Sequence, residues 1–133
     1  MFQNLSIFQM SHGMATHAGR LQVVAAQNMA NADTPGFQAK DLTPFKDTLQ
    51  TSKAGTTQRA TRSAHLNGIA QDGPLVGRAS VILDETAQND PNGNSVAIED
   101  EILRAVDAKR QHDRALAIYR SSLNILRTSI GRS

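Results

Sequence analysis

The chain has 133 residues, of which 39% are hydrophobic but only 4% aromatic, and its formal net charge is +2. This length suits a single domain, although the apolar material for a core is thin. The basic residues are dispersed, which argues against a nucleic-acid partner, and the lack of cysteine excludes disulfides, thiolate catalysis and cysteine-type zinc sites. No apolar run approaches the ~18 residues of a membrane span, and the first residues do not read as a cleaved signal peptide. We therefore expect a protein that is cytoplasmic or exported without a cleaved signal.

The first helical pattern covers residues 5–31. Its apolar stripe has a near-heptad spacing and includes several small or soft side chains, and Gly13 within it lowers the intrinsic helix propensity. We predict a long N-terminal helix that needs a partner to cover this stripe. The residues on the stripe are Ile7, Met10, Met14, Ala18, Leu21, Ala25 and Asn28.

A helix stop follows in residues 28–37, which read Asn-Met-Ala-Asn-Ala-Asp-Thr-Pro-Gly-Phe. Pro35 lacks an N–H and restricts Thr34 to extended angles, so the helix is expected to end before it. Gly36 is free to adopt the positive φ that a turn requires. Asn28 and Asn31 lie in the last helical turns, and we predict that their side chains bond backbone groups of the turn or of an adjacent chain.

The middle of the chain, residues 38–94, is polar and irregular. An extended lead-in is expected to reach a short helix that starts at Pro44, with Phe45 and Leu49 on one face. Turn signals stand at residues 72–74 and 89–93. Ala79–Leu83 is the best strand candidate, with Leu75-Val76 as the start of a hairpin partner.

Helical periodicity returns at Ser95 and continues to the end of the chain as a heptad seam. Asn94 or Ser95 is expected to cap its start, and acidic residues in its first turns and arginines near its end suit the helix dipole. Lys109 and His112 interrupt the seam. Its members are Ile98, Ile102, Ala105, Lys109, His112, Leu116, Tyr119, Leu123, Leu126 and Ile130.

Together these elements predict a mainly α fold. Long N- and C-terminal helices would pack as an α-helical hairpin or coiled coil, and the irregular middle would hold extended segments with a short β-hairpin. The expected division is residues 1–34, 35–94 and 95–133 within one structural unit.

The sequence offers no convincing catalytic, cofactor or metal site. His12 and His17 are five residues apart, which is the wrong spacing for two ligands on one helical face. Asp90–Ser95 with Glu101 imitates a calcium loop, but Ser95 replaces the required glycine and Ile98 stands at an oxygen-ligand position. A turn followed by a helix explains the same residues, and we expect no enzymatic activity.

Residues 28–37 resemble the Asn-x-Ala-Asn-x-x-Thr-Pro-Gly-aromatic signature of bacterial flagellar basal-body rod and hook proteins. The continuation Gln38–Leu42, with Phe45 and Leu49, is most similar to the proximal-rod members of that family, and residues 61–66 resemble them more weakly. Asn94, Val96, Tyr119 and Leu123 also fit, whereas the acid that the family carries at position 97 is Ala97 here.

This resemblance implies a structural subunit of the flagellar rod that is exported uncleaved by the flagellar type III apparatus and assembles as a homo-oligomer within a helical tube. Its implied partners are other rod subunits, the FliE adaptor and the MS ring. The implied assembly motif is Asn28, Ala30, Asn31, Thr34, Pro35, Gly36 and Phe37. The residues expected to carry helix packing are Met14, Leu21, Ile102, Leu116, Tyr119, Leu123, Leu126 and Ile130.

Two alternatives remain open on the sequence alone. One is another axial rod subunit such as FlgC, although the Arg-x-Tyr-x-x-Asn pattern of that protein near its C-terminus is absent. The other is a cytoplasmic helical adaptor, which would have no use for the Asn-Ala-Asn-Thr-Pro-Gly stretch.

Overall fold

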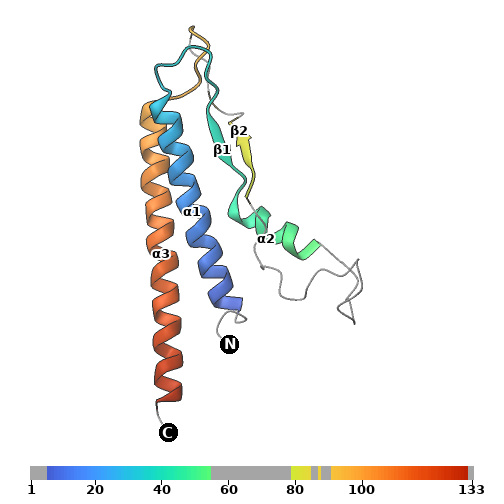
Figure 1. Ribbon diagram of the computed structural model, residues 1–133, viewed down its shortest axis with the longest axis vertical. Helices are drawn as coiled ribbons and strands as arrows, with labels where there is room; N and C mark the ends of the chain where they lie inside the picture. Colours follow the sequence, from blue (N-terminus) through green and yellow to red (C-terminus); the bar gives the residue numbers. More distant parts are fainter. Residues whose placement is uncertain (1–5, 55–78, 85–86, 88–90, 132–133) are drawn as a thin grey trace, which may run out of the picture.

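Two long helices dominate the computed structural model, which describes residues 6–54, 79–84, 87 and 91–131. Helix α1 (Ser6–Ala30) and helix α3 (Ile98–Ile130) lie side by side and antiparallel (Figure 1). Asn28 near the end of α1 bonds Glu101 near the start of α3, and the Phe8 and Tyr119 rings meet at the other end with centroids 5.1 Å apart. The predicted mainly α hairpin is confirmed. The divisions predicted after residues 34 and 94 fall just outside these two helices.

Small side chains line the contact between the two helices. On α3 the buried residues are spaced by seven: Glu101, Ala108, Ala115 and Ser122. On α1, Ser11, Ala18 and Ala25 repeat the same spacing. Ala18 and Ala115 are both 0% exposed. Because side-chain size at the contact sets the distance between helix axes, this alanine and serine seam brings the two backbones close together.

The large apolar residues of the predicted α3 seam fall beside this line. Positions 102, 109, 116 and 123, of which 109 is a lysine, each directly follow a buried residue of the line, so their side chains lie at the flank of the contact. Ile102 is 49% exposed, and Leu116 and Leu123 are half-buried. The hairpin is therefore closed by small residues, and much of the large apolar surface of α3 stays outside the closure.

A two-stranded antiparallel sheet packs beside α1. Strand β1 (Lys40–Leu42) pairs with strand β2 (Val81–Leu83), and Asp41 lies opposite Ile82. The predicted strand at residues 79–83 thus contains β2, but its described partner is β1, far earlier in the sequence, and the two strands do not form a local hairpin. Leu75-Val76, the turn at 72–74 and residues 61–66 lie outside the described residues.

Helix α2 (Phe45–Ala54) begins directly after Pro44, as expected for a proline at a helix start. His17 of α1 holds this region in place. Its Nε2 lies 2.8 Å from the Thr43 carbonyl oxygen, and its ring meets the Phe45 ring edge-on with centroids 5.6 Å apart. Within the described ranges, no helix is long and apolar enough to cross a membrane.

Candidate functional site

The candidate site is the corner where the chain leaves α1 and later returns to α3. We define it as residues 28–40 together with residues 92–101. Helix α1 ends at Ala30, and turns continue through Pro35 to Gly36. Gly36 and Gly93 both have positive φ, at 73° and 79°. The Gly36 N–H donates to the Asn92 carbonyl at 3.2 Å, and a Cβ on Gly93 would lie 3.4 Å from the Gly36 Cα. Glycine at these two positions lets the outgoing and returning strands cross in contact.

Asn94 closes the end of α1 from the returning strand. Its Nδ2 lies 3.0, 2.6 and 2.9 Å from the carbonyl oxygens of Asn31, Ala32 and Thr34. Its Oδ1 accepts the Val96 N–H at 2.7 Å, and the residue is 1% exposed. The last carbonyls of a helix lack partners within the helix. The carbonyls that Asn94 bonds belong to the turns directly after α1, so Asn94 fixes the path of the chain beyond the helix from 60 to 63 positions away in sequence.

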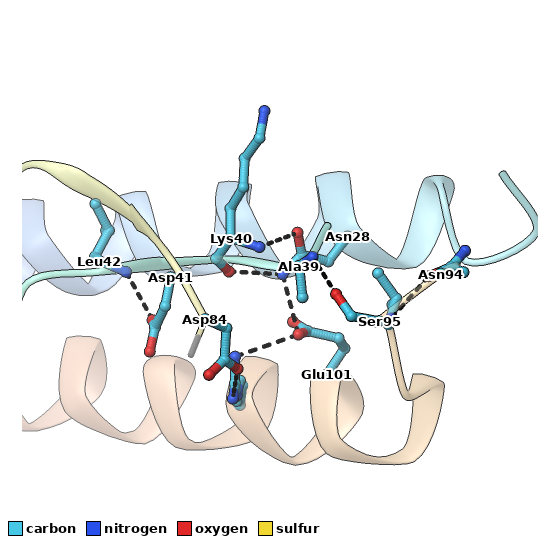
Figure 2. Close-up of polar contacts among 11 residues, drawn as sticks. Asn28, Ala39, Lys40, Asp41, Leu42, Asp84, Asn94, Ser95 and Glu101 are labelled. Atoms are coloured by element: carbon cyan, nitrogen blue, oxygen red, sulfur yellow. Dashed lines mark hydrogen bonds and ion pairs between the residues drawn. The ribbon is translucent and has the colours of Figure 1, made fainter. Parts of the chain in front are cut away.

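Asn28 joins three elements, as Figure 2 shows. Its Oδ1 accepts the Lys40 N–H at 3.1 Å, and its Nδ2 donates to the Lys40 carbonyl at 2.7 Å. The same Nδ2 donates to Glu101 Oε1 on α3 at 3.0 Å, and Asn28 is 0% exposed. The Asn28 amide thus bonds both backbone groups of Lys40, as a neighbouring strand would, and also connects β1 to α3 through Glu101.

Glu101 is the charged member of the buried network. It is 3% exposed, and Arg104 approaches it at 3.4 Å while also forming an ion pair with Asp84, next to β2. Burial raises the pKa of the Glu101 carboxyl, against the opposing effects of the Asn28 hydrogen bond and the Arg104 charge. Burial of Arg104 acts to lower its pKa, but bonding to Asp84 and the attraction of the neighbouring carboxylates outweigh it and raise the pKa of the guanidinium. The network therefore connects α1, both strands and α3.

The raised pKa of Glu101 predicts a specific pH dependence. A group whose pKa is higher in the folded protein contributes its stability fully below the unfolded value of 4.5 and loses that contribution as the pH rises through the folded value. Relative to Glu101→Gln, the native chain should therefore become progressively less stable as the pH rises from below 4.5. Urea denaturation of both proteins across this range measures the difference. A stability advantage of the native chain over Glu101→Gln that grows with pH would contradict the assignment.

The remaining residues of the implied assembly motif are placed less deeply. Asn31 is half-buried, and its Nδ2 donates to the Gln27 carbonyl at 2.8 Å, within α1 itself. Thr34 Oγ1 donates to Asn31 Oδ1 at 3.4 Å. The exposed members of the motif are Ala30, Thr34, Pro35 and Gly36. Phe37 is half-buried, and the Lys40 Nζ lies 5.7 Å from the centroid of its ring. Both asparagines thus bond backbone groups, but only Asn28 reaches another element.

The predicted cap of α3 by Asn94 or Ser95 is wrong. The N-cap residue is Ala97, in an extended conformation with φ −94° and ψ 113°, and it makes no side-chain cap bond. The two candidate side chains are engaged elsewhere, since Asn94 bonds the end of α1 and Ser95 Oγ accepts the Ala39 N–H at 2.8 Å. The first N–H groups of α3 therefore lack the side-chain acceptor that usually stabilises a helix start.

Ala97→Ser should stabilise the protein, because a serine at this N-cap can accept an N–H of the first turn. The expected gain in the free energy of unfolding is about 1 kcal/mol. Ala117→Ser, at an exposed position inside α3, controls for the intrinsic effect of serine and should be neutral or slightly destabilising. Thermal denaturation followed by circular dichroism measures both, and equal changes at positions 97 and 117 would refute the capping explanation.

The structure places the expected helix-packing residues around the closed hairpin at different depths. Met14, Leu21, Leu116, Leu123 and Leu126 are half-buried. Tyr119 is 39% exposed although its ring touches Phe8, and Ile130 is 63% exposed. Their role in packing between subunits stays a prediction.

The geometry is that of a structural joint. Buried amides and an ion-pair network hold α1, the two strands and α3 together. No cluster of three potential metal ligands occurs in the described part of the chain. Periodicity identified Asn28 as a polar residue on an apolar stripe. Sequence reasoning did not assign Asn94 and Glu101 to the joint, because nothing local distinguishes them from an ordinary turn residue and a helix-start carboxylate.

Comparison with known proteins gives one informative similarity. The chain is 28% identical over 130 residues to a curated protein of Agrobacterium fabrum named "Flagellar basal body rod protein FlgB". The alignment covers 98% of this chain and 96% of the relative. No protein-family model matches the chain. The similarity confirms the resemblance to flagellar rod proteins, and its coverage includes the corner and both long helices.

Proposed function

We propose that this chain is a structural, non-enzymatic subunit of the bacterial flagellar basal-body rod, in the position that FlgB occupies in the proximal part of this drive shaft. The proposal is supported by the full-length similarity to FlgB and by the hairpin of terminal helices joined at the Asn-Ala-Asn-Thr-Pro-Gly corner. In this role the chain would polymerise through its terminal helices and be required for flagellar assembly and motility.

The observation that carries the assembly part of the proposal is the apolar surface left outside the hairpin. Large apolar side chains remain exposed on both helices, with Val23 at 57%, Leu103 at 63% and Ile125 at 67%. Small residues already close the intramolecular contact, so this surface is available for neighbouring subunits. Packing against neighbouring subunits would bury these apolar side chains.

Assembly would complete the ordering of the helices. Phe8 and Val24 are the large apolar side chains buried on α1, and the buried residues of α3 are Glu101 and three small residues, so the hairpin gains modestly from apolar burial. Ordering each residue costs about 1–2 kcal/mol of conformational entropy. Contacts with neighbours would supply the missing burial. Folding and assembly would thus be coupled, and the corner, fixed by Asn28 and Asn94, would set the direction in which the middle segment leaves the tube.

The proposed partners are other rod subunits, the FliE adaptor, the MS ring and the type III export apparatus that delivers the chain without cleaving a signal. The proposed location is the rod of the basal body, in the periplasmic space. A cytoplasmic adaptor would instead remain in the cytosolic fraction.

The test is complementation of a deletion strain of the source bacterium with the native chain and with Leu123→Glu. Leu123 is half-buried beside the seam, so a carboxylate there should prevent packing between subunits while the hairpin seam stays intact. We expect the native protein in detergent-extracted basal bodies and normal swimming. The variant should be exported but absent from basal bodies, and its cells should not swim.

Asn124→Glu provides the matched control, because residue 124 is exposed on the same turn of α3. It should assemble and support swimming. A native protein found only in cytosol would overturn the rod assignment, and full motility with Leu123→Glu would overturn the role of this helix face.

A further inference from the structure

The charges of the chain are segregated along its sequence. Between Arg78 and Arg104 there are six acidic residues and no lysine, arginine or histidine. After Asp113 there are four arginines and no acidic residue. The small net charge of +2 does not reveal this separation. A helix dipole favours acidic residues only in the first turn and basic residues only in the last turn, so it does not account for charged stretches of this length.

The fold carries these two stretches to opposite ends of the molecule. The acidic stretch includes β2, the returning strand of the corner and the first turn of α3. The arginine-rich stretch is the far end of α3 (Figure 1). Helix α3 has 33 residues, so the two ends are separated by roughly 50 Å at 1.5 Å per residue. The molecule is therefore a rod with an acidic corner and a basic tip.

The basic tip is also apolar and extends beyond α1. The contact of Phe8 with Tyr119 places the start of α1 near the level of residue 119, and α3 continues to Ile130. Among the described residues no element lies opposite residues 123–127, where Leu123 and Leu126 are half-buried and Ile125 is 67% exposed. Arg120 and Arg127 flank these side chains, are exposed and make no ion pair within the described ranges.

The acidic corner holds an open pocket of about 630 Å³. Its lining includes the apolar side chains of Val96 and Ile98 and the carboxylates of Asp33, Glu99 and Asp100. These three carboxylates are exposed and have no ion-pair partner in the described part of the chain, whereas Asp84 and Glu101 are paired with Arg104. The pocket thus has a mainly polar lining with free negative charge and two larger apolar side chains, Val96 and Ile98.

We propose that the basic tip of α3 docks into the acidic corner pocket of a second copy of this chain, head to tail. Arg120 and Arg127 would meet Glu99, Asp100 and Asp33, and Leu123, Ile125 and Leu126 would contact Val96 and Ile98. The inference rests on the proposed function and supplies a longitudinal contact for it. A contact between two different surfaces of the same molecule can repeat without closing, which is how open filaments form.

Charge complementarity favours a second copy over other occupants. The basic, apolar tip alone would also suit an anionic lipid surface. A lipid surface, however, would bind only the basic tip and leave the acidic pocket empty. In a head-to-tail contact between copies, the tip of one copy binds the pocket of the next, so both ends of the molecule are used. Attraction between such patches steers association and weakens with salt.

The experiment is sedimentation velocity of the purified full chain at low and high salt, with two charge-reversed proteins. The tip variant is Arg120→Glu with Arg127→Glu, and the corner variant is Glu99→Arg with Asp100→Arg. We expect the native chain to associate at low salt and dissociate at high salt. Each variant alone should need at least about tenfold more protein for half-association, because like charges then face each other. An equimolar mixture of the two should regain association, since every tip again meets a corner of opposite charge.

Arg110→Glu is the matched control, because Arg110 lies mid-helix on α3 with its side chain 75% exposed and should not alter association. If the corner variant loses helicity, the neutral variant Glu99→Gln with Asp100→Asn replaces it. This neutral variant should associate more weakly than the native chain, and mixing it with the tip variant should not restore association. The proposal is overturned by a native chain that stays monomeric at all salt concentrations, by variants that associate like the native chain, or by a mixture that stays dissociated. Tip-dependent binding to phosphatidylglycerol vesicles by a monomeric chain would assign the tip to a membrane instead. Basal-body location of the native chain is scored separately, so the rod assignment can stand if this contact fails.

Discussion

Replacing Asn28 with Leu should destabilise the protein by about 3 kcal/mol. Leucine has a similar size, so little cavity forms, but the substitution leaves the Lys40 N–H and carbonyl without their partner and removes a donor from buried Glu101. Buried polar groups that lose their partners carry most of the expected loss. Urea denaturation measures the free energy of unfolding, and amide hydrogen exchange at Lys40 should accelerate because its acceptor is gone.

Asn31→Leu is the control for this prediction, because it tests an asparagine from the same motif and the same helix end. Asn31 is half-buried, and in the described part of the chain its side chain bonds only the Gln27 carbonyl within α1 and the Thr34 hydroxyl. Its replacement should cost less than about 1 kcal/mol and leave exchange at Lys40 unchanged. Equal losses for the two variants would mean that the tie between α1, β1 and α3 does not depend on the Asn28 amide.

Ala115→Leu should destabilise the hairpin by about 2 kcal/mol. Ala115 is 0% exposed on the small-residue seam, where the backbones of α1 and α3 approach closely, and there is no space for a larger side chain. The helices must separate or the leucine must adopt a poor rotamer. Thermal denaturation followed by circular dichroism measures the loss.

Ala117→Leu makes the same chemical change two residues further along α3, at an exposed position. It should alter the free energy of unfolding by less than about 0.5 kcal/mol. A similar loss at both positions would refute the close approach of the helices at Ala115, because it would trace the effect to helix propensity.

Hydrophobic periodicity located the long helices well, since residues 5–31 and the region after Ser95 contain α1 and α3. It misplaced half of the α3 contact line by one residue. The method assigns the largest apolar side chains to the interior, whereas this hairpin buries Ala108 and Ala115 and leaves Ile102 half-exposed. A seam of alanine and serine gives a weak hydrophobic periodicity. The stronger periodicity comes from the large apolar residues beside the seam, which lie on the flank of α3 and not in its contact with α1.

The corner was predictable only in part, because its key contacts are distant in sequence. The Pro35-Gly36 turn and the oddity of Asn28 are local features that sequence reasoning can detect. The bonds from Asn94 to the turns after α1 and from Asn28 to Glu101 join residues at least 60 positions apart. Strands β1 and β2 are also distant in sequence, and no local turn motif predicts that they pair.

The pairing of β1 with β2 has a consequence for engineering this chain. The Thr43 N–H donates to the Ser80 carbonyl at 3.0 Å, and the Ser80 N–H donates to Thr43 Oγ1 at 3.2 Å, so the polypeptide between these residues starts and ends at the same place. Inserting residues between two points that are already joined is inexpensive, since each doubling of the length between them adds only about 0.6 kcal/mol of closure entropy. A fluorescent or affinity tag spliced in after Ala54 would leave both terminal helices uninterrupted, where a tag fused to either end of the chain would burden one of them.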